Sequence, residues 1–421
     1  MEKPISEYAA VVGIDWADQK HDVWLLARGE ERVERSVLEH RPVKIREWAN
    51  RLRERFGGAP IAVCLELSQG PIVSALLEYD FFVIYPVQPA MLARYRKTFT
   101  PSGAKDDPTD AEYALDMLRR HPEQFEPLKL ESPAMRSLRK LVEARRDLVD
   151  DRVRVTNRLT YALKAYFPQV LSWFRDKDTQ VFINFIERWP SLQAAKRARS
   201  ATVEEFFRSH NVRRKATISR RVEDIKEALP LTRDPAIIEP AQVVVETLLP
   251  QLRALVDSIE RLDDEIEKVC AKLPDYRLFA TLPGAGRVFA SRLLAAFGEQ
   301  RGRFPNAASL QKYAGVAPVT KRSGKSHTVH WRWACPTFLR QTFVEWTAQT
   351  IPRSFWAKAS YERHRARGAS HNATVRALAY KWLRILWRCW VDQKPYDESR
   401  YLDALRKRHS PLLKYAADSS N

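Results

Sequence analysis

The sequence predicts an α/β domain at the N-terminus followed by a mostly helical remainder, and three observations lead to this class. Short apolar runs alternate with amphipathic stretches up to about residue 121. An apolar heptad pattern covers residues 245–273. After Pro274, a glycine-containing turn leads into an apolar helix. A length of 421 residues with 45% apolar content suits two to four domains with cores of their own.

The first domain, residues 1–125, is predicted from the order of its strands and helices. We expect strands at residues 9–14, 23–27, 32–38, 60–67 and 81–86, and helices at residues 43–56, 91–97 and 110–119. Three strands followed by alternating helices and strands describe a mixed sheet of the ribonuclease-H kind. In such a sheet, acidic residues gather at strand ends near the centre.

Four acidic residues in this domain are candidate metal ligands. Asp15 and Glu66 lie at or near the ends of apolar strands, where an unpaired carboxylate is costly unless a cation neutralises it. Asp107 and Asp110 are three residues apart, so a helix would present both on one face. Four converging carboxylates suit Mg²⁺ (or Mn²⁺), a hard cation that takes oxygen ligands and is often shared with substrate phosphates. The pattern therefore indicates phosphodiester chemistry.

The second region, residues 130–275, is predicted to be helical and to contain a coiled coil. Its apolar seam steps by three and four residues through Val245, Leu248, Leu252, Leu255, Ile259, Leu262, Ile266, Val269 and Leu273. We expect Pro250 in or near the first turn and Pro274 just after the end. A helix at residues 135–167 would pair with this one, either as a hairpin within one subunit or as an oligomerising coil with another protomer. Residues 170–240 are expected to form a small basic helical insert.

The third region, residues 276–400, is predicted to be mostly helical, and residues 401–421 to form a tail. Its stretch Leu282-Pro-Gly-Ala-Gly-Arg287 matches a helix-hairpin-helix loop. In such a loop, Gly284 and Gly286 let backbone N–H groups approach a phosphate at a helix N-terminus. Arg287 would add a cation at the same place. A simple helix cap is the alternative explanation of the two glycines.

The formal net charge of +19 is unevenly distributed along the chain. Residues 300–384 hold sixteen Lys and Arg but two acids, which gives this stretch a charge of +14. A basic field of this size favours a polyanion through phosphate neutralisation and counterion release, so we expect a nucleic acid as partner. The alternative, a set of solvated helix faces, fits less well because acids are nearly absent and aromatic residues are interleaved.

Cysteine usage and hydropathy bear on the compartment. The four cysteines, Cys64, Cys270, Cys335 and Cys389, lie far apart without C-x-x-C spacing, which argues against a zinc ribbon or a disulfide framework. Acids interrupt the N-terminus, and Lys and Arg break the most apolar C-terminal stretch, so neither a signal peptide nor a membrane span is expected. We therefore expect a cytoplasmic protein with reduced cysteines.

A serine beside a glycine lies in a basic segment of the third region. Ser323 precedes Gly324 and is surrounded in sequence by Lys321, Arg322 and Lys325. On these residues alone the segment is an ordinary loop with a turn, because a catalytic serine needs a base, a metal or another activator. Ser326 is a similar candidate.

Histidines and tryptophans near the serine allow weaker predictions. His327 and His330 could act as base or phosphate contact, although an exposed loop histidine is more often a plain polar residue. Trp331 and Trp333 could stack on bases. The helical spacing of Trp382, Trp387 and Trp390 favours burial in a core.

In combination, these motifs resemble those of the DEDD-type insertion-sequence transposases of the one-ten class, relatives of the Piv DNA invertase that are now called bridge recombinases. The resemblance rests on Asp15 in Gly-Ile-Asp, Glu66, the Lys105-x-Asp107-x-x-Asp110-Ala111 element, the Leu-Pro-Gly-x-Gly loop, and Gly315-Val-Ala-Pro318 followed by Ser323-Gly324. It spans residues 9–125 and 276–390, and the helical middle matches in layout only. Its specificity comes from the order of the motifs, because no single one would suffice.

The resemblance implies roles for particular residues. Asp15, Glu66, Asp107 and Asp110 would form the RuvC-like metal-binding tetrad, and Ser323 would be the nucleophile of a C-terminal serine transposase domain. Members excise and insert their element through a circular intermediate, and many are guided by a noncoding bridge RNA that pairs with donor and target DNA. Lys321, Arg322, Lys325 and Arg332 would contact nucleic acid. We expect a homo-oligomer, a dimer or tetramer, associated with the nucleoid in the cytoplasm of a prokaryote.

Two positions depart from the family pattern. The third acid follows Lys105-Asp106 where the family has Lys-Thr, so Asp106 could compete with Asp107 as a ligand. Arg332-Trp-Ala-Cys-Pro336 stands where the family has a glycine-containing turn, although Pro336 still suits a helix start.

Two other function classes remain open at this point. A RuvC-like structure-specific endonuclease would need the four acids for hydrolysis but would not need Ser323. A non-catalytic nucleic-acid-binding scaffold would need neither. A metal-dependent nicking assay that also detects protein covalently attached to DNA separates the three.

Overall fold

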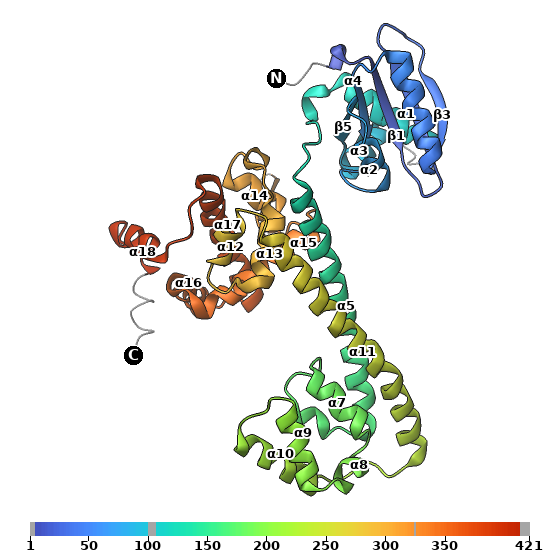
Figure 1. The fold of residues 1–421 in the computed structure, drawn as a ribbon. Coiled ribbons are helices and arrows are strands. Elements are labelled where there is room, and N and C mark those ends of the chain that lie inside the picture. Colours follow the sequence, from blue (N-terminus) through green and yellow to red (C-terminus); the bar gives the residue numbers. More distant parts are fainter. Residues whose placement is uncertain (1–4, 100–106, 324–325, 413–421) are drawn as a thin grey trace. The chain divides into compact units, whose positions relative to one another are not determined.

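The computed structural model describes residues 5–99, 107–323 and 326–412, together with their side chains except those of residues 107–109, 321, 326 and 327. The chain forms two compact units, Met1–Leu130 and Glu131–Asn421 (Figure 1). The regions predicted at residues 130–275 and 276–400 thus belong to one unit. Among the described residues, no helix combines the length and the apolar character that crossing a membrane requires.

The first unit is built on a five-stranded mixed sheet. Its strands are β1 (Ala10–Asp15), β2 (Lys20–Ala27), β3 (Glu34–Glu39), β4 (Ile61–Leu65) and β5 (Phe82–Pro86), and their order across the sheet is β3-β2-β1-β4-β5. β2 runs antiparallel to β1 and β3, whereas β1, β4 and β5 are parallel. The predicted mixed sheet is confirmed, and its assignment to the ribonuclease-H kind stays a prediction.

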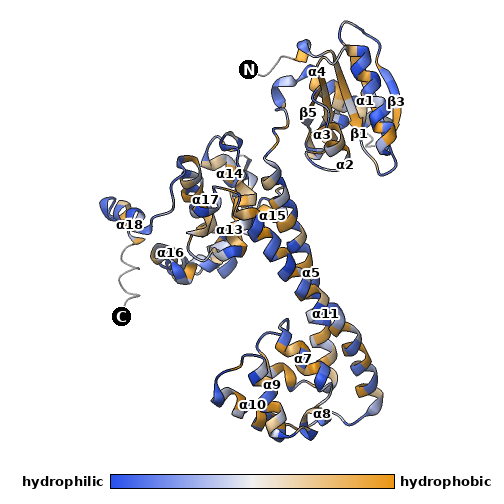
Figure 2. Ribbon diagram, viewed as in Figure 1, coloured by the Kyte–Doolittle hydropathy of each residue, from blue (hydrophilic) through white to orange (hydrophobic). Residues whose placement is uncertain are grey.

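Helices cover both faces of this sheet. They are α1 (Pro42–Phe56), α2 (Pro71–Leu76), α3 (Pro89–Phe99) and α4 (Asp107–Arg120). Alternate strand residues such as Val12 and Leu65 pack with α1 and α2, while Val11 and Cys64 pack with α3 and α4. The central strand β1 is accordingly apolar along most of its length (Figure 2). α2 was missed from the sequence because six residues carry too short a stretch of helical periodicity.

The helix α4 lies directly on β1 at Gly13. A Cβ atom at Gly13 would lie 2.0 Å from the carbonyl oxygen of Ala111 and 2.7 Å from the amide nitrogen of Leu115. Because both atoms belong to the helix backbone, they cannot move aside without moving α4. The glycine therefore sets how closely the helix that carries Asp110 approaches the sheet.

The second unit is organised around two long helices, α5 (Pro133–Tyr166) and α11 (Pro235–Cys270) (Figure 1). The start of α5 packs with the end of α11, through Met135 and Ile266 among others. The end of α5 packs with the start of α11, for example through Leu163 and Val245. The two helices are therefore antiparallel within one chain. This agrees with the predicted hairpin, whereas a coiled-coil geometry and an oligomer stay predictions.

The prediction for the start of α11 was wrong. The helix begins at Pro235, so Pro240 and Pro250 both lie inside it and not in a first turn at Pro250. An internal proline removes a backbone hydrogen bond. Two features favour the longer helix: Asp234 caps it, because its Oδ1 accepts a hydrogen bond from the amide of Ala236 at 2.9 Å, and its apolar seam is buried.

A small set of helices connects the two long helices, and this insert ends before the predicted boundary at residue 240 because α11 begins at Pro235. It consists of α6 (Val170–Trp173), α7 (Gln180–Arg188), α8 (Leu192–Arg197), α9 (Ser200–Ser209) and α10 (Lys215–Glu227). Phe182, Phe185 and Phe207 are fully buried at its centre and share one core with the end of α5. The insert is therefore packed onto the paired helices.

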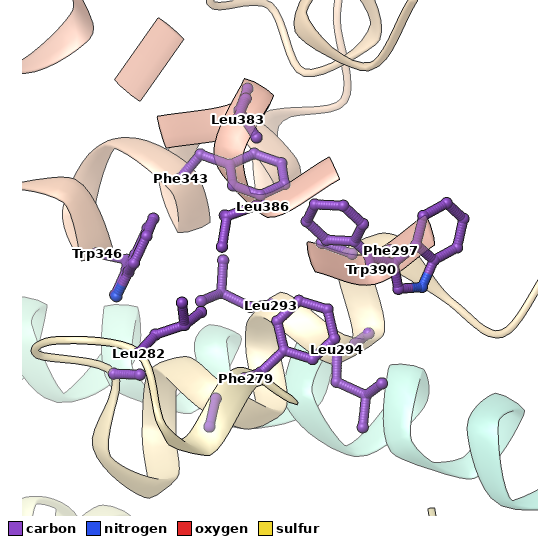
Figure 3. Close-up of a cluster of buried hydrophobic side chains, with 14 of the residues drawn as sticks. Phe279, Leu282, Leu293, Leu294, Phe297, Phe343, Trp346, Leu383, Leu386 and Trp390 are labelled. Carbon is purple, nitrogen blue, oxygen red and sulfur yellow. The ribbon is translucent and has the colours of Figure 1, made fainter. Parts of the chain in front are cut away.

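The remaining residues form a helical region with one β-hairpin. Its elements are α12 (Tyr276–Ala280), α13 (Gly286–Phe297), α14 (Ala307–Tyr313), β6 (Val319–Ser323), β7 (Ser326–His330), α15 (Thr337–Thr350), α16 (Phe355–Ala366), α17 (His371–Asp392) and α18 (Glu398–Lys407). Phe297, Phe343 and Trp390 meet in the core from three different helices (Figure 3). Trp382 is also fully buried, so the predicted burial of Trp382 and Trp390 is confirmed.

Candidate functional site

Asp15 and Glu66 lie side by side at one end of the sheet. Asp15 is the last residue of β1, and Glu66 follows the last residue of β4. The two strands are parallel, with Ile14 opposite Leu65, so the next residue of each strand carries an acid. Side chains alternate along a strand, and Ile14 and Leu65 both face α1 and α2. Asp15 and Glu66 therefore belong to the opposite face, which α3 and α4 cover.

Asp110 approaches this face from α4. It precedes Ala111, the residue whose carbonyl oxygen lies over Gly13, and Gly13 is two residues before Asp15 on the same face. The Asp110 side chain is only 8% exposed. Nη1 of Arg96, in α3, donates hydrogen bonds to both of its carboxylate oxygens, at 2.7 and 2.6 Å. The guanidinium thus neutralises a carboxylate that burial would otherwise destabilise.

The other acids of the predicted tetrad are only partly described. Asp107 is the first residue of α4 and lies three residues before Asp110, as predicted, but the structure describes only its backbone. Asp106 and Lys105 lie outside the described residues. The choice between Asp106 and Asp107 as a ligand therefore stays a prediction.

A further acid at this end of the sheet escaped sequence analysis. Asp22 of β2 is the direct cross-strand partner of Asp15. Because Val23 faces α1 and α2, alternation places Asp22 on the same face as Asp15. Asp22 can be recognised as a neighbour of Asp15 only from the register of the β1–β2 hairpin, since nothing in the sequence around Asp22 indicates a ligand.

The carboxylates match Mg²⁺ in chemistry. Asp15, Glu66 and Asp110 supply hard oxygen donors on one face of the sheet. Asp110 is buried and is paired with the guanidinium of Arg96. Within the ranges that the structure describes, no three His, Cys, Asp or Glu side chains are close enough to hold a metal ion by themselves.

A pair of histidines fixes the turn that follows Asp15. The amide of Ala17 donates to Nδ1 of His21 at 3.1 Å, and Nε2 of His21 lies 2.9 Å from Nδ1 of His40. His21 is fully buried. Burial, and to a smaller extent the neighbouring His40, lower the pKa of His21 to about 4. The neutral ring can therefore keep Nδ1 as an acceptor for the turn.

Ser323 terminates a strand and does not lie in a loop, which corrects the sequence prediction. It is the last residue of β6, it is exposed, and its cross-strand partner is Ser326, the first residue of β7. Arg322 is also exposed. Of the predicted phosphate contacts nearby, Lys325 lies outside the described residues, as does Gly324, and only the backbone of Lys321 is described. The two candidate serines thus share the end of one hairpin.

In the glycine-containing turn before α13, backbone conformation and close packing explain the first glycine. Gly284 has a φ of +70°, and a Cβ atom there would lie 2.6 Å from the carbonyl oxygen of Gln349. Nε1 of Trp346 donates to the carbonyl oxygen of Pro283 at 3.1 Å, which holds the turn on α15. Gly286 has a φ of +50° and open space around it, and Arg287 is exposed beside it. Gly286 and Arg287 are thus exposed, with Nη1 of Arg287 3.7 Å from Oε2 of Glu267, and their contact with a phosphate stays a prediction.

The segment between β7 and α15 has no glycine, and packing fixes it instead. Nε of Arg332 donates to the carbonyl oxygen of Ala317 at 3.4 Å. Cys335 packs against Gly315, where a Cβ atom would lie 2.2 Å from Sγ. These contacts attach the segment to the residues that lead into β6. The predicted helix start is close to the observed one, since α15 begins at Thr337, directly after Pro336.

The structure brings part of the predicted site together. Asp15, Glu66 and Asp110 share one face of the sheet in the first unit, while Ser323, Arg322 and Arg332 belong to the second unit. Asp22 and Arg96 join the acids, and neither was predicted.

Comparison with known proteins matches two separate stretches of the chain to transposase families. A family model for a DEDD-type IS110 transposase matches residues 12–168, which include the acids, and one described as "Transposase IS116/IS110/IS902 family" matches residues 276–362, which include the hairpin. The chain is 28% identical, over 96% of its length and 98% of the relative's, to a candidate mini-circle transposase for IS117 from Streptomyces coelicolor. It is 26% identical to an uncharacterized 43.6 kDa protein of insertion element IS110 from the same species, over 92% and 95% of the two chains. An uncharacterized 42 kDa protein of IS900 from Mycobacterium paratuberculosis is 27% identical over 69% of this chain and 73% of its own length.

Proposed function

Because the chain belongs to the IS110 class of DEDD transposases, we propose that it is a DNA recombinase that cuts and rejoins the ends of a mobile element. In this proposal Ser323 is the nucleophile, and acids of the first unit hold the metal ion that assists it. The proposal goes beyond family membership, which supports a transposase with a DNA partner but assigns no nucleophile and no metal.

One observation carries the assignment of the acids. Asp15 and Glu66 occupy equivalent positions at the ends of two neighbouring parallel strands, and α4 brings the buried Asp110 to the same face. Carboxylates on a rigid sheet end need little rearrangement to receive a cation. Asp15, Glu66 and Asp110, with Asp107 or Asp106, would hold Mg²⁺ or Mn²⁺. When bound, such an ion polarises the scissile phosphate and neutralises the charge that develops on its oxygens.

A serine nucleophile suits a reaction that must both cut and rejoin. Oγ of Ser323 attacks the phosphorus and forms an O–P bond, while the bond from phosphorus to one deoxyribose oxygen breaks. The serine gives up its proton, and the leaving oxygen takes up a proton. A hydroxyl of another DNA end then attacks the phosphoserine, which restores a phosphodiester and the serine hydroxyl. Because the ester energy is kept in the phosphoserine, rejoining needs no ATP.

The basic surface would position the nucleic acids without reading their sequence. Residues 300–384 carry a charge of +14, and contacts of Lys and Arg with phosphates are independent of base identity. We therefore assign target choice to base pairing with an element-encoded bridge RNA. The acting species would be a homo-oligomer in the bacterial cytoplasm.

The deciding experiment looks for protein attached to DNA. Full-length protein, Mg²⁺, the element's noncoding RNA and a labelled junction DNA should give a covalent adduct that resists denaturation. Ser323→Ala should abolish the adduct while DNA binding persists, and Ser326→Ala should leave the adduct in place. Asp15→Asn or Glu66→Gln should prevent cleavage without weakening DNA binding, because the basic surface is untouched.

Each other outcome rejects a defined part of the proposal. An adduct that survives Ser323→Ala but not Ser326→Ala would move the nucleophile to the other serine of the hairpin. Cleavage without any adduct in both variants and in the double variant would favour the hydrolytic endonuclease. Full recombination by Asp15→Asn at ordinary Mg²⁺ would remove Asp15 from the metal site.

A further inference from the structure

An exposed tryptophan follows the serine hairpin. We call residues 331–335, between β7 and α15, the tryptophan loop. Trp333 is 80% exposed, whereas the indole of Trp331 is half-buried. A tryptophan of this exposure leaves a large apolar ring in water, and residues of this kind are common where a protein binds a partner.

The tryptophan loop has a defined position relative to Ser323. The contacts of Arg332 with Ala317 and of Cys335 with Gly315 attach it to the segment that leads into β6. The hairpin register pairs Val319 with His330 at one end and Ser323 with Ser326 at the other. The tryptophan loop and the serine are therefore separated by the hairpin length, about 13 Å. Stacked bases are spaced about 3.4 Å apart, so this length corresponds to roughly four nucleotides.

Cations support the tryptophan loop from two helices. The guanidinium carbon of Arg376, in α17, lies 3.9 Å from the ring centroid of Trp331, and that of Arg340, in α15, lies 5.6 Å from it. The Trp331 and Trp333 ring centroids are 6.4 Å apart. Across the described ranges, no carboxylate forms an ion pair with Arg332, Arg340 or Arg376. Within the described part of the chain, their charges are thus not paired with a carboxylate.

We propose that Trp333 stacks on an unpaired base of the DNA strand that Ser323 attacks. Trp331, fixed by Arg376, supports Trp333 from the protein side, and the three arginines receive the phosphates that flank the base. An aromatic ring stacks on any base, while positive charge beside it holds the backbone, so the ligand is a single-stranded segment a few nucleotides from the cleaved bond. The proposal rests on the proposed role of Ser323 for its location, and it concerns binding and not chemistry.

Stacking is tested by removing the ring and the base separately. Affinity is measured for full-length protein carrying Ser323→Ala, so that cleavage cannot occur, on junction DNA with one abasic nucleotide scanned within six positions of the cleavage site. We expect Trp333→Ala to weaken binding of intact DNA about tenfold, the size typical of one stacked base. One abasic position should weaken DNA binding by the protein that retains Trp333 by the same factor. Combining Trp333→Ala with that abasic position should weaken binding no further.

Two controls separate stacking from general effects. Trp333→Phe keeps an aromatic ring and should retain most of the affinity. Phe355→Ala removes another exposed aromatic side chain, 55% exposed at the start of α16, and should have no effect. Because Trp333 has little buried surface, its removal should leave the fold intact, which circular dichroism checks.

The outcomes distinguish this proposal from the proposed function. If wild-type protein forms the adduct at Ser323 but every abasic position is additive with Trp333→Ala, the stacking proposal is wrong and the nucleophile stands. If the non-additive position exists but no adduct forms, stacking stands and the nucleophile is wrong. Weakened RNA binding with unchanged DNA binding in Trp333→Ala would overturn the proposal in favour of an RNA ligand.

Discussion

The guanidinium of Arg96 donates to both carboxylate oxygens of Asp110, which is the buried one among the tetrad side chains that the structure describes. We expect Arg96→Ala to destabilise the first unit by about 3 kcal/mol without divalent metal, because it leaves the Asp110 carboxylate buried and uncompensated. Urea titration measures this loss of unfolding free energy, and hydrogen exchange of the α4 amides measures the protection of that helix. Arg53→Ala is the matched control: Arg53 pairs with Asp80 at 2.7 Å but both side chains are exposed, so about 1 kcal/mol or less should be lost.

The same variant tests Asp110 as a metal ligand. Mg²⁺ should restore the hydrogen-exchange protection of α4 in Arg96→Ala, since a bound cation replaces the missing one. It should have a smaller effect on wild-type protein. Hydrogen-exchange protection that stays low at every Mg²⁺ concentration would mean that Asp110 binds no metal. Equal losses of unfolding free energy in Arg96→Ala and Arg53→Ala would mean that the buried ion pair stabilises the unit no more than the exposed one.

His21 should make the first unit sensitive to acid. Its pKa of about 4 in the folded chain lies below its ordinary value of 6.5, so the unfolded chain binds the proton first as the pH falls. The contribution to stability is complete above pH 6.5 and is lost between pH 6.5 and 4, with a slope of up to about 1.4 kcal/mol per pH unit. His21→Gln should remove this slope from urea titrations, whereas the surface variant His121→Gln should keep it. Identical slopes in the two variants would contradict the assignment.

At the scale of elements, Gly13 couples the sheet to α4. Gly13→Ala should destabilise the first unit by roughly 1–3 kcal/mol, because the added methyl group meets helix backbone and not a flexible side chain. It should also reduce cleavage by displacing Asp110. Gly302→Ala is the matched control, since Gly302 has open space and should change neither stability nor cleavage. Unchanged hydrogen exchange of α4 in Gly13→Ala would show that the helix is not held by this contact.

The elements that the sequence predicted well are those whose pattern is local. Strand alternation placed Asp15 and Glu66 at strand ends, and the heptad seam identified the paired helix. The misses involve information that is not local. Asp22 became a neighbour of Asp15 only through hairpin register, and Arg96 reached Asp110 only through the packing of α3 on α4. The start of α11 was missed because Pro250 indicates a boundary that capping at Asp234 and burial of the seam override.

For the whole molecule, the proposed division of labour predicts two modes of DNA binding. Protein freed of RNA by ribonuclease should bind DNA of any sequence, and its affinity should fall steeply with salt because phosphate contacts dominate. Recombination of a chosen donor and target should require the element's noncoding RNA, and changing one RNA loop should redirect the target. Gel-shift and recombination assays on the same samples measure both. Efficient recombination of native sites by RNA-free protein would show that the chain reads DNA itself.

The antiparallel pairing of α5 and α11 has a consequence during synthesis of the chain. Met135 and Leu138 of α5 pack with Ile266 and Leu273, so their partners emerge from the ribosome about 130 residues later. At ordinary translation rates this delay is on the order of ten seconds. The first unit ends at Leu130 and can fold in that interval, while the apolar face at the start of α5 stays uncovered. A nascent chain stopped before residue 235 should therefore carry a folded first unit and an α5 whose first turns are sensitive to protease and bind chaperones.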